Sequence, residues 1–116
     1  MIRVGSLWRD LPQRPLDREV TEVILDRQGL RIERILSTGQ TTLEGQWYDQ
    51  DTDEWVLLAV GAARLRIEGE HQDRALAAGD WVLLPAGCRH QVTWTSAEPP
   101  TVWLAVHFPP IVEAKR

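Results

Sequence analysis

The stretch Gly79-Asp-Trp-Val-Leu-Leu-Pro-Ala-Gly-Cys-Arg-His90 has the spacing G-x5-P-x-G-x2-H and says more about the fold than any other part of the chain. Its opening Gly-Asp pair is typical of a turn, and residues 81–84 form an apolar run of strand-forming residues. Pro85 ends that strand because it cannot donate to a sheet ladder, and Gly87 lets the backbone reverse. The pattern predicts a strand, a bend and a second strand that starts at His90.

Short apolar runs separated by turn residues continue through the rest of the chain. We expect strands at 23–25, 30–36, 55–60, 63–67, 81–84, 91–95 and 102–108. Helical periodicity is nearly absent. Many short strands at near-regular spacing predict an all-β fold, an antiparallel sandwich or barrel.

Length and composition predict a single domain. With 116 residues, 43% of them hydrophobic and 26% charged, the chain can bury one ordinary core. Prolines among alternating charges predict an extended N-terminal arm over 1–20, followed by a barrel over 21–110 and a C-terminal tail over 111–116. Such an arm could lie across a partner subunit.

Charge and cysteine content restrict the partners. The net charge is −4 and the basic residues are scattered, which argues against nucleic acid as a partner. The single cysteine excludes a disulfide framework and a thiolate zinc cluster. No stretch is long enough to span a membrane, and the first residues do not resemble a signal peptide, so a cytoplasmic location is expected.

Alternation along the strands predicts which side chains face the core. In the run 30–36, Leu30, Ile32, Arg34 and Leu36 share the face expected to point inward. Arg34 would then need a carboxylate partner or an anionic ligand, because an unpaired buried charge is unfavourable.

Two other runs, 55–60 and 81–84, are apolar on both faces. Their outer side chains would meet solvent in a monomer, so we expect a homodimer whose interface covers them. The alternative is that the N-terminal arm or the C-terminal tail folds over this face.

The segment that ends at Gly61 supplies a second group of polar side chains. Glu54 opens an apolar strand in which it shares a face with Val56, Leu58 and Val60. Tyr48 and Gln50 have the same parity as Glu54, so the three side chains could converge on one site.

Together the two segments resemble the two sequence motifs of the cupin superfamily. The later cupin motif is G-x5-P-x-G-x2-H-x3-N, and Gly79, Pro85, Gly87 and His90 stand at its positions. Trp94 replaces the final Asn. In the earlier motif, G-x5-H-x-H-x3 or 4-E-x6-G, Glu54 and Gly61 match the second half, and the places of the two histidines fall on Tyr48 and Gln50 or on Trp47 and Asp49.

The resemblance spans Leu30 to Phe108 and implies a small single-domain cupin, a double-stranded β-helix or jelly-roll barrel. Of the usual four metal ligands it keeps Glu54 and His90, with Tyr48 and Gln50 in the places of the histidine pair. The resemblance therefore implies a divalent transition metal (Fe, Mn, Ni, Zn or Cu) and a dioxygenase, isomerase or lyase acting on a small organic molecule.

The residues themselves leave alternatives open. Without a metal, Glu54 and His90 form an acid and base pair suited to proton abstraction. They could also simply pair with each other, in a structural dimer without catalysis.

A third reading is a metal-free module that binds or senses a small molecule. Stacking on Trp47, Tyr48 and Trp94 would hold the ligand at the barrel mouth. Arg34 and His107 are the other candidate ligand contacts.

Overall fold

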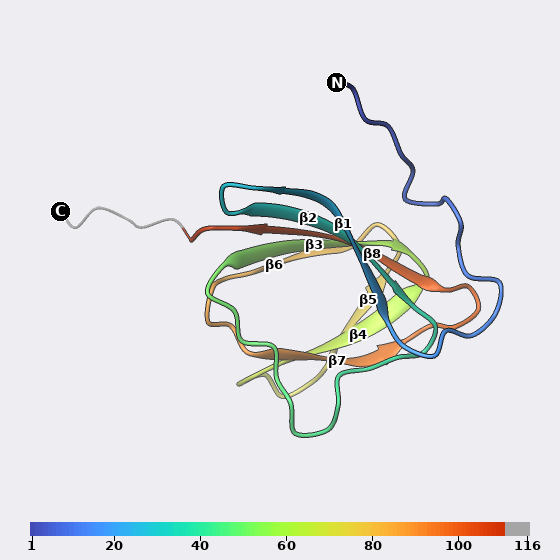
Figure 1. The fold of residues 1–116 in the computed structure, drawn as a ribbon. Helices are drawn as coiled ribbons and strands as arrows, with labels where there is room; N and C mark the ends of the chain where they lie inside the picture. Colours follow the sequence, from blue (N-terminus) through green and yellow to red (C-terminus); the bar gives the residue numbers. More distant parts are fainter. Residues whose placement is uncertain (111–116) are drawn as a thin grey trace.

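Two antiparallel β-sheets lie face to face and form the body of the protein (Figure 1). The computed structural model describes residues 1–110, and among them no helix is long and apolar enough to cross a membrane. The eight strands are β1 (Val20–Arg27), β2 (Leu30–Ser37), β3 (Asp53–Val60), β4 (Ala62–Ile67), β5 (Arg74–Ala77), β6 (Trp81–Leu84), β7 (His90–Thr95) and β8 (Thr101–Phe108). The first sheet has the order β1-β2-β8-β3-β6 and the second the order β5-β4-β7. The prediction of an all-β jelly roll is confirmed.

Every apolar run expected to be a strand lies inside one of these strands. The sequence missed only β5, whose residues Arg-Ala-Leu-Ala are poor strand formers, so its pairing with β4 decides its conformation. The expected tail over 111–116 lies outside the described residues.

The core lies between the sheets. Its buried members come from both layers: Val56, Leu58, Ala63, Leu65, Leu84, Trp103 and Ala105. Full burial of one such large apolar side chain contributes roughly 1.5–3 kcal/mol. The inward face predicted for β3 is confirmed by the buried Val56 and Leu58.

The motif glycine Gly61 joins β3 to β4 where no side chain fits. Its φ is +86°, and a Cβ there would clash with Ser96 Oγ and lie 2.8 Å from the carbonyl oxygen of Pro100. Ser96 Oγ instead accepts a hydrogen bond from the amide of Ala62 at 3.0 Å. The turn between the two sheets is thereby fixed against the connection that precedes β8.

The bend after β6 carries the other motif residues and positions His90. The amide of Cys88 donates to the carbonyl of Pro85 at 3.0 Å, and Gly87 has a φ of +78°, as a type II turn requires. The amide of Gly87 also donates to the carbonyl of Gln50 at 2.8 Å. The bend is therefore tied to the loop before β3, and His90 begins β7 beside that loop.

The inward face expected for β2 was wrong. Glu33 and Ile35 line the interior, whereas Ile32 and Arg34 lie on the outer face, against the N-terminal arm. The physical reason is that the N-terminal arm packs over the outer face and covers Ile32 and Arg34, while on the inner face Glu33 lines the cavity. Apolar parity therefore pointed to the wrong side of the strand.

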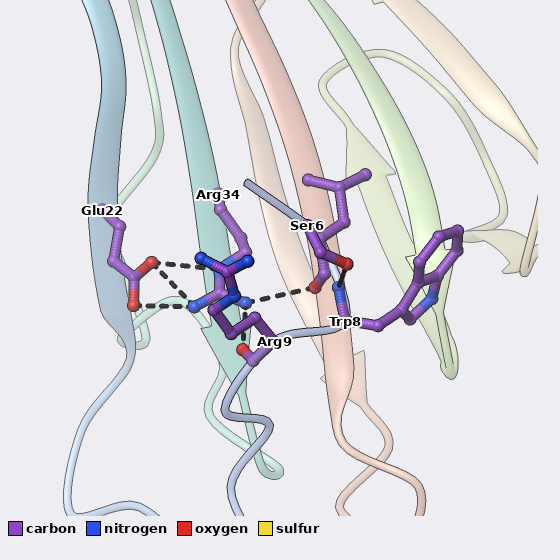
Figure 2. A network of polar contacts seen from close by, with 6 residues as sticks. Ser6, Trp8, Arg9, Glu22 and Arg34 are labelled. Atoms are coloured by element: carbon purple, nitrogen blue, oxygen red, sulfur yellow. Dashed lines mark hydrogen bonds and ion pairs between the residues drawn. The ribbon is translucent and has the colours of Figure 1, made fainter. Parts of the chain in front are cut away.

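Arg34 anchors the arm to the outer face of the sheet (Figure 2). Its guanidinium donates to both carboxylate oxygens of Glu22 at 2.8–3.0 Å. It also donates to the carbonyls of Leu7 at 3.2 Å and Arg9 at 2.6 Å. Of the two partners expected for a buried Arg34, a carboxylate or an anionic ligand, the structure provides the carboxylate.

At the other end of the five-stranded sheet the outer face is apolar, and none of residues 1–110 covers it. Trp81 is 60% exposed and Leu83 51% exposed on the edge strand β6. The rings of Trp81 and Trp55 lie 6.3 Å apart between centroids. The predicted exposure of large side chains by this apolar run is confirmed.

Candidate functional site

A cavity of about 230 Å³ lies between the two sheets. Its polar wall is formed chiefly by Glu19, Glu33, Tyr48, Glu54 and His90. The rest of the wall is mostly apolar and includes the indole of the buried Trp103. An apolar cavity with a few convergent polar groups is the usual form of a small-molecule site.

Glu54 is the most unusual of these groups. It is the second residue of β3, opposite His107 of β8, and its side chain is only 10% exposed. Its Oε1 lies 3.7 Å from His90 Nε2 and its Oε2 lies 3.9 Å from His107 Nε2. Among the described residues, Oε1 has no hydrogen-bond partner. Burial raises the pKa of Glu54, and the neighbouring His107 and His90 only partly offset this.

His90 faces Glu54 because its other ring nitrogen is held by the backbone. Nδ1 lies 2.9 Å from the carbonyl oxygen of Cys88, which can only accept, so Nδ1 carries a hydrogen and Nε2 points to Glu54. Tyr48 and His90 also exchange two backbone hydrogen bonds, at 2.8 and 3.1 Å. Their rings stack with centroids 5.3 Å apart. The loop before β3 thus fixes the imidazole on one side of the cavity.

His107 and Glu33 form a second pair on the neighbouring strands. His107 Nε2 lies 2.8 Å from Glu33 Oε1, and both side chains are nearly buried. Arg31 Nε approaches the other oxygen of Glu33 at 3.3 Å. The carboxylate of Glu33 is therefore compensated from two sides, unlike that of Glu54.

Glu19 and Tyr48 complete the polar wall. Ser37 Oγ donates to Glu19 Oε2 at 3.0 Å, but burial still raises the pKa of Glu19. Burial also raises the pKa of Tyr48, and the charges of Glu19 and Glu54 raise it further. The phenol therefore stays a neutral hydrogen-bonding group at physiological pH.

The structure brings together Glu54, His90 and Tyr48 from the residues predicted for the site. His107 lies directly behind them, within 3.9 Å of Glu54. Gln50 is a neighbour in the loop, where its backbone carbonyl holds the bend at Gly87.

Three other predicted ligand contacts do not line this cavity. Arg34 lies on the outer face of β2, as described above. Trp47 belongs to a separate depression, with its ring 5.3 Å from the guanidinium carbon of Arg89. Trp94 is 47% exposed and pairs with Arg64, because the β4–β7 register shifts at this point and leaves Val92, not Trp94, facing inward.

Sequence reasoning missed Glu33 and Glu19. Glu33 was placed on the solvent side by the same parity that placed Arg34 inside, and Glu19 was counted as part of the arm. A signal for Glu33 did exist, because it shares its face with Ile35. For Glu19 we find none, since its position depends on how the arm enters β1.

The described side chains do not fit a metal centre. Within residues 1–110 no group of three or more His, Cys, Asp or Glu residues is placed to hold a metal ion. Glu54 and His90 supply two donors that face each other, while Glu33 is committed to His107 and Arg31. The arrangement is that of a carboxylate and imidazole pair.

A jelly-roll barrel with a polar site between its sheets defines the class of protein. The family model of the cupin domain matches residues 35–107. The chain belongs to the cupin family, as its two motifs predicted. A comparison with curated proteins finds no match.

Solved structures agree with this assignment. A putative mannose-6-phosphate isomerase from Ralstonia eutropha JMP134 is 44% identical, with a TM-score of 0.89 over 93% of this chain and 99% of that chain. A conserved protein of unknown function from Streptococcus pyogenes is 23% identical, with a TM-score of 0.72 over 97% of this chain and 91% of that chain. A cupin superfamily protein from Desulfitobacterium hafniense DCB-2 is 16% identical, with a TM-score of 0.68 over 87% of this chain and 96% of that chain. The last two show the fold alone.

Proposed function

We propose that this cupin binds a small organic molecule in the cavity and moves a proton on it with Glu54 and His90. The observation that carries the proposal is the buried carboxylate of Glu54, with a raised pKa, facing His90 Nε2 across 3.7 Å inside a cavity. A raised pKa makes the ionised carboxylate a stronger base, and perturbed carboxylates in clefts are typical of acid–base sites.

The pair suits an isomerisation that passes through an enediol. Glu54 takes the proton from the carbon next to a carbonyl, and the C–H electron pair forms a C=C bond. Because Nδ1 already holds one hydrogen for the Cys88 carbonyl, His90 acts as the acid in its doubly protonated form and gives the hydrogen on Nε2 to the carbonyl oxygen. In the second half Glu54 returns its proton to the neighbouring carbon, while His90 takes the proton of the other hydroxyl. Atoms and electrons balance, and no further reactant is consumed.

The Ralstonia protein supports the reaction class. Its description names an isomerase, and it shares 44% of its sequence with this chain over nearly the whole length of both. Isomerisation of a sugar is a proton transfer between neighbouring carbons of the kind that Glu54 and His90 can perform.

Hydrogen exchange tests this proposal without knowledge of the product. Chelator-treated protein in D2O is incubated with a panel of aldoses, ketoses and amino ketones, and deuterium entry at carbon is followed by NMR. We expect catalysed exchange on a member of the panel. Glu54→Gln should lower its rate at least about a hundredfold, the usual contribution of a general base. Glu44→Gln, a change of the same charge at an exposed loop residue, should not.

The metal ligation predicted for Glu54, His90, Tyr48 and Gln50 stays a prediction that the same experiment tests. Exchange that appears only after Fe, Mn, Ni, Zn or Cu is restored would show metal dependence and contradict the metal-free mechanism. No exchange under either condition would leave a binding or structural role for the pair.

We also propose that the chain forms a homodimer through the uncovered face around Trp81, Leu83 and Trp55. These side chains lie at the edge of the five-stranded sheet, where a second copy can meet the same patch about a two-fold axis. Exposed Trp81 and Leu83, with Trp55 packed beside Trp81, have the composition of an interface centre.

A further inference from the structure

The cavity wall carries negative charge that its own residues leave uncompensated. Three of the twelve lining residues are glutamates, Glu19, Glu33 and Glu54, and none is a lysine or an arginine. Glu33 is paired with Arg31 and His107. Glu19 accepts a hydrogen bond from the neutral hydroxyl of Ser37. Of the three lining glutamates, Glu19 and Glu54 have no arginine or lysine partner within 4 Å among residues 1–110.

The unpartnered oxygen of Glu54 shows where a donor is needed. Glu54 is 8% exposed, and Oε1 is buried without a hydrogen bond among the described residues. A buried acceptor of this kind is unfavourable until a donor reaches it. His90 Nε2, at 3.7 Å, is beyond hydrogen-bond distance. Because Glu54 lines the cavity, a ligand that enters can supply the missing hydrogen bond.

We infer that the cavity selects a small organic cation, with a primary ammonium group that donates to Glu54 Oε1 and a compact apolar body. The inference rests on the proposed function only in taking the cavity as the ligand site. An ammonium group has three N–H donors and no acceptor, so it suits a wall that offers carboxylate oxygens. The apolar body lies against Ile35, Val56 and Trp103, whose indole also attracts a cation near its face.

The same wall disfavours anions. A phosphate or carboxylate ligand would meet Glu19 and Glu54 with no lysine or arginine in the lining. Proteins bind such anions through Arg and Lys side chains or backbone amides at helix N-termini, and neither of these lines the wall. The phosphate named in the description of the Ralstonia protein therefore has no lysine or arginine side chain to receive it in this cavity.

Three ligands of the same shape and different charge test the inference. Cyclohexylamine, cyclohexanol and cyclohexanecarboxylate are titrated into chelator-treated protein, and binding is followed by tryptophan fluorescence and calorimetry. We expect the amine to bind about tenfold more tightly than the alcohol, and the carboxylate most weakly, from the strength of charge-assisted hydrogen bonds.

Substitutions then locate the effect. Glu54→Gln should weaken the amine about tenfold and leave the alcohol unchanged. Glu19→Gln should weaken the amine by a smaller factor, and it serves as the second variant if Glu54→Gln does not fold. Glu44→Gln removes the same charge from the surface, so it controls for general attraction of an amine to a chain of net charge −4.

Other outcomes overturn the inference in distinguishable ways. If the alcohol or the carboxylate binds as tightly as the amine, the cavity does not select cations, while the proposed proton transfer can still stand. If Glu44→Gln weakens the amine as much as Glu54→Gln does, the attraction is general and the inference fails. If none of the three binds saturably, the inference fails, and the hydrogen-exchange experiment decides separately whether the site is catalytic.

Discussion

Arg34 and Glu54 are both buried charged residues of the five-stranded sheet, but on opposite faces and in opposite states. Arg34 lies on the outer face with five hydrogen bonds, three to Glu22 and two to backbone carbonyls of the arm. Glu54 lies on the inner face with an oxygen that accepts none. The first charge is fully paired by the fold, and the second is left for something that enters the cavity.

The contrast separates a structural charge from a functional one. A buried charge with complete partners fixes the position of neighbouring segments, as Arg34 fixes the arm at residues 7–9. A buried charge with a raised pKa and an empty hydrogen-bonding position destabilises the folded state unless a ligand uses it. Burial alone does not distinguish the two, since both residues are less than a tenth exposed.

Replacing Arg34 should have the largest effect on stability. Arg34→Leu leaves Glu22 and two backbone carbonyls without their donor, and we expect a loss of about 2 kcal/mol in the free energy of unfolding. The loss stays below that of a fully buried pair because the side chain of Glu22 is 47% exposed and can hydrate. Urea unfolding measures it, with Arg64→Leu at an exposed position of β4 as the control. If Arg34→Leu leaves the stability unchanged and weakens ligand binding, Arg34 is a ligand-binding residue and not an anchor of the arm.

Replacing a side chain on the uncovered part of the outer face should weaken the dimer and leave the stability of the fold unchanged. Trp81→Lys places a charge in the proposed dimer interface. We expect it to raise the dissociation constant of the dimer about tenfold. Sedimentation over a range of concentrations measures this. Trp94→Lys changes a similarly exposed tryptophan on the other sheet and should leave the dimer intact. A wild-type chain that sediments as a monomer throughout would contradict the proposed dimer.

Replacing Glu54 should have the smallest effect on stability and the opposite sign. Because the pKa of Glu54 is raised above its ordinary value of 4.5, the folded state binds more protons than the unfolded state between 4.5 and the raised pKa. Stability therefore falls as pH rises through this window and then levels off. Glu54→Gln removes this loss, so its melting temperature should match the wild type near pH 4 and exceed it at pH 8. A variant that is less stable at pH 8 would show that Glu54 is a satisfied structural residue.

The sequence predicted much of the fold because its signals are local. The apolar runs and turn glycines predicted seven of the eight strands. The motif residues Pro85, Gly87 and His90 predicted the bend that the structure confirms. Glu54 and His90, which the sequence predicted to share a site, have Oε1 and Nε2 3.7 Å apart. Each of these predictions needs only the residues of one strand or one turn.

Predictions failed where a residue's surroundings come from distant segments. Parity along β2 identifies two faces but does not say which of them the arm covers, so Arg34 and Glu33 were exchanged. Trp94 was misplaced because the shift in the β4–β7 register is set by the pairing of the two strands. His107 was predicted as a ligand contact, and its contact with Glu33 could not be predicted because it joins residues 74 positions apart.

By itself, the sequence determined that this chain forms strands, where they turn, and that a carboxylate and an imidazole stand at the two cupin motifs. Local backbone preferences and alternation suffice for that, since they act within a few residues. Only the tertiary structure decided which buried charge is paired and which is free. That depends on the packing of the arm and of β8 against β2 and β3, because the environment of a charge is set by every segment that surrounds it.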